Sequence, residues 1–138
     1  MILKGRKVND GKVEGEAIVY NGMFSFLGDI DPRTGKVPVK GHALEGKSLA
    51  DKIFVFTTGK GSTAGPFIAY EAKKRGVAPR GMICQEAEPV IALGAIMANI
   101  PMVDKLDKDP LKVIQTGDYV KLNADEGIVE VVKKGSPQ

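Results

Sequence analysis

The chain has 138 residues, of which 20 are Lys or Arg and 17 are Asp or Glu, and we expect residues 1–138 to form a single domain. With one cysteine and one histidine, it cannot form an internal disulfide, a closed zinc site or a cluster held by several thiolates, so we expect no metal or cofactor bound by this chain alone. The net charge of +3 is spread along the sequence and no apolar run is long enough to cross a membrane, so we expect a cytoplasmic protein that binds neither nucleic acid nor membranes.

Alternating apolar and polar residues predict β-strands at both ends of the chain. Residues 1–8 are predicted as one edge strand and residues 13–20 as a second strand. Near the other end, residues 119–122 and 128–132 are predicted strands, and the turn-forming residues 123–127 between them predict a hairpin. These segments indicate antiparallel β-structure on either side of the middle of the chain.

The middle of the chain alternates short apolar strands with helices, after an irregular segment at residues 24–52 that is rich in Gly, Asp and Pro. Strand–helix–strand–helix–strand order predicts a small parallel sheet with right-handed crossovers. The expected fold class is therefore α/β, with two β-layers and one helical layer. The three strands are expected at residues 53–57, 82–84 and 100–103. The first helix is expected at residues 67–75, where residues 62–66 favour its start and Gly76 ends it. The second helix is expected to start at residues 86–89 and to end at Asn99.

The glycine-rich turn after the first buried strand is the most informative stretch of the sequence. Gly59, Gly61 and Gly65 resemble a dinucleotide-binding turn, with one residue more than the usual spacing before the last glycine. A P-loop is excluded because Lys60 precedes Gly61 instead of standing directly before Ser62. A third interpretation makes Ser62 a reactive hydroxyl whose alkoxide is stabilised by Lys60 and by the positive end of the following helix. Ser62 also fits a plain helix N-cap, and the residues alone leave these alternatives open.

Five segments of the chain match, in order and spacing, the small subunit of a known enzyme family. They are residues 24–35, 59–63, 86–90, 94–101 and 117–120, with the sequences FSFLGDIDPRTG, GKGST, EAEPV, GAIMANIP and GDYV. Through them the chain resembles the small subunit of the aconitase X family. The resemblance implies a swivelling β/β/α domain with a small parallel βαβαβ core and flanking antiparallel strands. It also implies a large partner subunit that carries an iron–sulfur cluster, expected to be 4Fe-4S, so that this chain is active only in a heteromer.

The activity implied by this resemblance is a dehydration. In the archaeal branch of the family, a hydro-lyase converts (R)-5-phosphomevalonate to trans-anhydromevalonate 5-phosphate in the mevalonate route to isoprenoids, and the resemblance makes Ser62 the proton acceptor. A related dehydratase for another hydroxy acid, such as cis-3-hydroxy-L-proline, stays open. So do a stand-alone dinucleotide-binding module and a non-catalytic interaction domain.

Six further residues are candidates for binding the substrate or stabilising the alkoxide. Four lie in the glycine-rich turn and two in the irregular segment, and they are Gly59, Lys60, Gly61, Thr63, Asp31 and Arg33. Arginine is suited to a phosphate or carboxylate group of a substrate. No role is assigned to His42, expected on a surface loop, or to Cys84, expected as a small core residue at a strand end.

Overall fold

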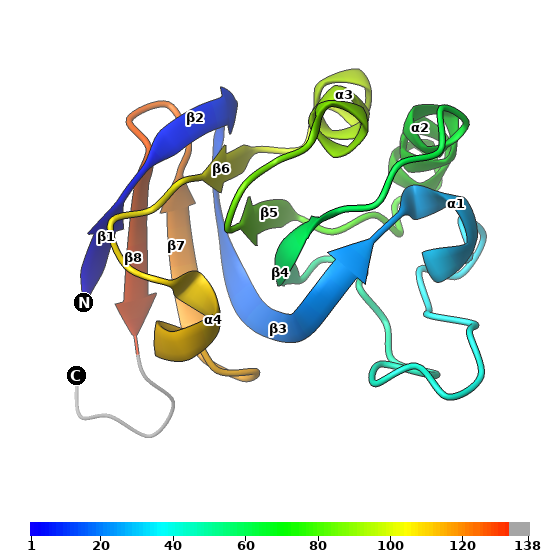
Figure 1. Cartoon of the computed structure of the whole chain (residues 1–138), viewed down its shortest axis with the longest axis horizontal. Helices are drawn as coiled ribbons and strands as arrows, with labels where there is room; N and C mark the ends of the chain where they lie inside the picture. Colours follow the sequence, from blue (N-terminus) through cyan, green and yellow to red (C-terminus); the bar gives the residue numbers. More distant parts are fainter. Residues whose placement is uncertain (133–138) are drawn as a thin grey trace.

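The longest strand, β3 (Lys12–Phe24), belongs to both β-layers of the molecule (Figure 1). In the computed structural model, which describes residues 1–132, the start of β3 pairs antiparallel with β7 (Tyr119–Asn123) and the rest pairs parallel with β4 (Ile53–Gly59). The strand expected at residues 13–20 is therefore longer than predicted, because partners in both layers extend its hydrogen bonding. Residues 133–138 of the expected domain lie outside the described part of the chain.

The parallel part of the sheet confirms the expected alternation of strands and helices. β4 is followed by α2 (Gly65–Lys74), β5 (Gly81–Cys84), α3 (Pro89–Ala98) and β6 (Met102–Asp104), and the three strands pair in parallel. Both helices pack on the same face of these strands (Figure 1). The α/β fold with two β-layers and one helical layer is thus confirmed.

Two apolar cores lie on opposite faces of the parallel strands. Along β4, Phe54 and Phe56 point toward the helices, whereas Ile53 and Val55 point toward the antiparallel layer. The ring of Phe24 packs edge-on against Phe54 at a centroid distance of 4.8 Å, and the rings of Phe54 and Phe56 stack at 4.7 Å. Burying each such side chain contributes about 2–3 kcal/mol to stability. A strand buried on both faces explains why the run at 53–57 is apolar without alternation.

The first nine residues form two strands at opposite edges of the sheet. β1 (Ile2–Lys4) pairs with β8 (Ile128–Val132), and β2 (Arg6–Asn9) pairs with β6, so that the strand order is β1-β8-β7-β3-β4-β5-β6-β2. The prediction of one edge strand at residues 1–8 is therefore wrong. The chain bends at Gly5, whose N–H donates to the carbonyl of Gly127 at 2.8 Å and where a Cβ atom would overlap the side chain of Leu106.

Two short helices were not predicted, and both begin at a side-chain cap. α1 (Phe26–Asp29) follows β3 and is capped by Ser25, while α4 (Pro110–Val113) follows β6 and is capped by Asp109. The end of α3 is as expected, since Asn99 adopts a left-handed conformation with φ of 53°. In residues 1–132, none of the helices has the length and apolar character needed to cross a membrane.

Removing the carboxylate of Asp104 should destabilise the protein, because it joins three segments at the end of β6. Asp104 is fully buried and accepts hydrogen bonds from Arg6 Nη2 and Ala87 N, both at 2.7 Å. Asp104→Ala leaves the N–H of Ala87 without its acceptor and should lower the free energy of unfolding by about 2 kcal/mol, as measured by urea denaturation. Glu71→Ala breaks only an exposed ion pair with Arg75 and should leave the urea concentration at the unfolding midpoint almost unchanged. Equal effects of the two variants would contradict this role for Asp104.

Candidate functional site

Ser62 lies on the loop that leaves the carboxyl end of β4, and we call residues 60–64 the Ser62 loop. Gly61 and Ser62 have φ angles of 90° and 74°. Holding a serine in this left-handed region costs roughly 1–2 kcal/mol. Ser62 and Thr63 are exposed. The loop therefore presents both hydroxyls to solvent in a backbone conformation that surrounding contacts have to maintain.

Ser62 does not cap α2, so the N-cap alternative is wrong. The helix begins at Gly65, two residues before the expected range, and its N-cap residue is Ala64, which makes no side-chain capping bond. The carbonyl oxygen of Ser62 instead accepts a hydrogen bond from Gly65 N at 2.9 Å. The hydroxyl of Ser62 is thus not committed to the helix end.

Ser25 and the short, kinked helix α1 that follows it hold the Ser62 loop in place, and we call these residues, 25–29, the support loop. The hydroxyl of Ser25 donates to the carbonyl oxygen of Gly61 at 2.9 Å. Lys60 Nζ lies 2.9 Å from Asp29 Oδ2, and the same oxygen accepts a hydrogen bond from Ser25 N at 3.0 Å. Because the carboxyl group of Asp29 is buried, this ion pair is shielded from water more than a surface pair would be. The two loops form one connected unit.

Sequence reasoning did not assign a role to Ser25 or Asp29. A signal was present, since a serine directly after a strand, followed four residues later by an aspartate, is close to the capping-box spacing. Ser25 Oγ accepts from Leu27 N at 3.1 Å while Asp29 accepts from Ser25 N, which is the reciprocal pattern of such a box. That the box also contacts Gly61 and Lys60 depends on the pairing of β3 with β4, which local sequence does not reveal.

Gly59 is required by a close approach between β4 and α3. A Cβ atom at this buried position would lie 2.7 Å from Ile91 Cβ and would overlap the carboxylate of Glu88. That carboxylate caps α3 by accepting from Ile91 N at 2.6 Å and Val90 N at 3.0 Å. The amino terminus of α3 therefore already holds an anion, and Gly59 leaves room for it.

Asp31 and Arg33 lie on a separate turn that directly follows the support loop. They form a turn in which Asp31 Oδ1 accepts from Arg33 N at 2.9 Å, and the side-chain hydrogen bond from Arg33 lowers the pKa of Asp31 below its usual value. The turn continues to Gly35, which approaches Val77 beyond the carboxyl end of α2. The start of this turn is two residues from Asp29, which pairs with Lys60, so the turn runs from the support loop toward the far end of α2.

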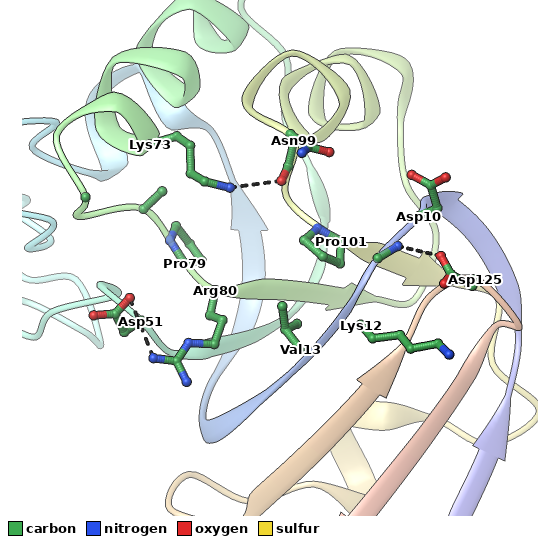
Figure 2. Close-up of a pocket in the computed structure, with 13 residues that line it drawn as sticks. Asp10, Lys12, Val13, Asp51, Lys73, Pro79, Arg80, Asn99, Pro101 and Asp125 are labelled. Carbon is green, nitrogen blue, oxygen red and sulfur yellow. Dashed lines mark hydrogen bonds and ion pairs between the residues drawn. The ribbon is translucent and has the colours of Figure 1, made fainter.

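A cavity of about 600 Å³ opens at the other end of the parallel strands (Figure 2). It is bordered by the carboxyl ends of α2 and α3 and by the residues before β4 and β5, and none of the predicted site residues lines it. Two of its cations already have partners, since Lys73 Nζ donates to the carbonyl of Asn99 at 2.9 Å and Arg80 Nη2 lies 3.8 Å from Asp51. The cavity is separate from the Ser62 loop.

An iron–sulfur cluster does not fit the residues of this chain that the structure describes. Cys84 is fully buried at the end of β5, as expected for a core residue, and burial raises the pKa of its thiol far above the usual value. A thiol in this state is a poor source of the thiolate that a cluster requires. Within residues 1–132, no three His, Cys, Asp or Glu side chains are grouped so that they could hold a metal ion.

His42 is partly buried against the ring of Tyr20 at a centroid distance of 4.4 Å.

The chain matches a known domain over nearly all of its length. The model of the aconitase X swivel domain family matches residues 2–131. The chain belongs to this family. The family resemblance seen in the sequence is thus confirmed, together with the swivel-domain fold that it implied.

Relatives of this aconitase X swivel domain share about half of its residues. A protein of Methanosarcina mazei named phosphomevalonate dehydratase small subunit is 46% identical over 135 residues, which are 98% of this chain and 94% of that protein. A protein of the same name from Thermococcus gammatolerans is 51% identical over 132 residues, which are 96% and 98% of the two chains. The crystal structure of Thermococcus kodakaraensis aconitase X in its holo-form superposes with a TM-score of 0.90 at 46% identity, over 96% of this chain and 99% of that one. The words "small subunit" imply a larger partner for the two named relatives.

Proposed function

We propose that this chain is the small subunit of a phosphomevalonate dehydratase, a hydro-lyase of the mevalonate route to isoprenoids. The proposal is supported by relatives of that name which match the chain nearly end to end at 46–51% identity. The reaction removes water from (R)-5-phosphomevalonate to give trans-anhydromevalonate 5-phosphate. Residues 1–138 act in it as one swivelling domain.

Ser62 is the proton acceptor in this proposal. Dehydration breaks a C–H bond and a neighbouring C–OH bond and forms a C=C bond, so a base has to take the proton. The observation that carries the role is the exposed hydroxyl of Ser62 on a backbone held at φ of 74°, because strain of this kind concentrates at functional sites. An alkoxide at Ser62 lies just before α2, whose amino terminus favours negative charge.

The remaining loop residues bind or position in the same proposal. Gly59 and Gly61 permit the backbone conformation of the Ser62 loop, and Thr63, next to Ser62 in the chain, faces the substrate. Lys60 holds the Ser62 loop through its ion pair with Asp29, while stabilisation of the alkoxide by Lys60 stays a prediction. Substrate contacts by Asp31 and Arg33 also stay predictions.

The iron–sulfur cluster, expected as 4Fe-4S, belongs to the larger subunit in this proposal. Its contribution is the Lewis-acid chemistry that a bound iron ion supplies to a leaving hydroxyl. Support comes from the poor fit of such a cluster to the described residues of this chain, above all the buried thiol of Cys84.

The cytoplasmic location expected from the sequence stays a prediction.

Anaerobic co-purification with the large subunit of the same organism tests the function. The heteromer should dehydrate (R)-5-phosphomevalonate, whereas either subunit alone should not. Turnover of cis-3-hydroxy-L-proline in place of phosphomevalonate would assign the chain to the related dehydratase. Saturable binding of NAD(P) or FAD by the isolated chain, with no dehydration by the heteromer, would favour the dinucleotide-binding alternative.

Loosening the support loop should lower turnover without weakening substrate binding. Ser25→Ala removes the hydrogen bond to the carbonyl of Gly61, and Asp29→Asn weakens the ion pair with Lys60. Because a small displacement of a reacting group is costly, kcat of the heteromer should fall about 10-fold or more while KM changes little. Steady-state kinetics on the reconstituted enzyme measures both constants.

A matched serine serves as the control for this prediction. Ser48 also accepts a backbone hydrogen bond at 3.1 Å, from Ala50 N, but it lies away from the Ser62 loop. Ser48→Ala should leave kcat unchanged, and Ser25→Thr, which retains the hydroxyl, should restore most of the lost turnover. Unchanged kcat in Ser25→Ala and Asp29→Asn would remove the positioning role of the support loop.

A further inference from the structure

Large apolar side chains are exposed on the helical layer. Five of the ten exposed large hydrophobic residues among residues 1–132 lie on α1, α2 and α3, and we call these five the helix-layer patch. They are Leu27, Phe67, Tyr70, Leu93 and Ile96, with exposed fractions between 46% and 66%. Isolated exposed residues of this kind are ordinary, but a concentration on neighbouring elements marks an interaction surface.

The composition of α3 supports the same conclusion. Its sequence, PVIALGAIMA, contains no polar side chain, although Leu93 and Ile96 are about half exposed. The opposite side of the helix, including Ile91 and Ala95, is buried against the sheet. A helix that is apolar all round is normally buried on every side, so the outer side of α3 lacks a covering surface within the described chain.

The helix-layer patch adjoins the Ser62 loop. Leu27 belongs to the support loop, and its backbone nitrogen lies within 3.8 Å of the position of a Cβ atom at Gly65, where α2 begins. Phe67 follows two residues later and is 66% exposed. The N-cap residue of α3, Glu88, packs against Gly59. The patch thus starts beside the proposed proton acceptor, and its other members lie on α2 and α3, which are neighbouring helices (Figure 1).

We infer that the helix-layer patch is the docking surface for the large subunit, a partner that offers a complementary apolar surface beside the substrate. The inference rests on the proposed function, which needs a partner that brings substrate to Ser62. A second copy of this chain seated here would instead cover the Ser62 loop with a chain that, over its described residues, has no metal-ligating cluster. The large subunit is the occupant that both covers the patch and completes the site.

The docking surface is tested by charged substitutions whose sign is favourable at their position in the helix. Position 67 is in the first turn of α2, where an acidic residue is favourable, and position 96 is near the last turn of α3, where a basic residue is favourable. Phe67→Asp and Ile96→Lys should therefore leave thermal unfolding of the isolated chain nearly unchanged. Each should weaken binding to the large subunit about 30-fold or more in an anaerobic titration, as expected for a central apolar contact.

The matched control is an apolar residue of equal exposure in the antiparallel layer. Ile2 on β1 is 53% exposed, against 52% for Ile96, and Ile2→Asp should leave the affinity for the large subunit unchanged. Wild-type affinity in both Phe67→Asp and Ile96→Lys would overturn the inference, even if the heteromer dehydrates phosphomevalonate. Sedimentation of the isolated chain as a dimer that Phe67→Asp dissociates would assign the patch to a second copy and would also overturn it.

Affinity and activity separate this inference from the proposed function. If the wild-type chain binds the large subunit through the patch but the heteromer does not dehydrate phosphomevalonate, the docking surface stands and the proposed reaction fails. If dehydration proceeds and the patch variants bind normally, the reaction stands and the docking surface fails.

Discussion

Ser62→Ala should abolish nearly all dehydration by the heteromer, lowering kcat by about three orders of magnitude. General base catalysis contributes about 10²–10⁴-fold to a rate, and an alanine at this position cannot accept a proton. The hydroxyl is exposed and does not cap α2, so folding and binding to the large subunit should be unchanged. Steady-state kinetics, thermal unfolding and a binding titration on the same preparations measure the three quantities.

A glycine at position 62 separates loss of the hydroxyl from disturbance of the loop. Because φ is 74° at this residue, Ser62→Gly relieves backbone strain while it removes the same oxygen. Both variants should be equally inactive, whereas Ser48→Ala, which removes a hydroxyl outside the Ser62 loop, should retain its turnover. Substantial activity in either Ser62 variant would exclude Ser62 as the proton acceptor.

Gly59→Ala should be the most destabilising single-methyl change near the site. The added Cβ would lie 2.7 Å from Ile91 Cβ and would displace the Glu88 carboxylate that caps α3. Overpacking and a lost cap together should lower the free energy of unfolding by about 2–4 kcal/mol, which moves the thermal midpoint by roughly 10 °C. Gly94→Ala is the control, because its Cβ meets Phe26 at an ordinary 3.4 Å and alanine favours a helix interior.

A double-mutant cycle identifies the contact responsible. Glu88→Ala alone removes the cap and should cost about 1 kcal/mol of unfolding free energy. In Gly59→Ala/Glu88→Ala the carboxylate is no longer displaced, so the loss should be about 1 kcal/mol smaller than the sum of the two single losses. Strictly additive losses would show that Gly59 and Glu88 do not act on one another.

Features encoded by neighbouring residues were predictable from the sequence. The hairpin of β7 and β8, the proline-led start of α3 and its end at Asn99 each depend on a few consecutive residues, and each was placed within about one residue. The glycine-rich turn was also recognised, since Gly59, Gly61 and Ser62 follow a buried strand and precede a helix.

Features that depend on distant pairing were not predictable in the same way. The contact of Ser25 with Gly61 joins residues 36 positions apart, and it exists because β3 and β4 are parallel neighbours. Asp31 and Arg33 were proposed from the irregular segment, whose path from the support loop to Val77 beyond α2 depends on contacts remote in sequence. The bend at Gly5 follows from contacts with residues 104–127, which are remote in sequence.

The bend at Gly5 also bears on how the chain folds as it is synthesised. β1 and β2 emerge first, but their partners are β8 and β6, so the first nine residues wait unpaired until most of the chain is made. Contacts of such long sequence separation form late and slow the final step of folding. Once formed, they make β1 and β2 the two edge strands of the sheet, and edge strands of only three and four residues limit edge-to-edge pairing between molecules.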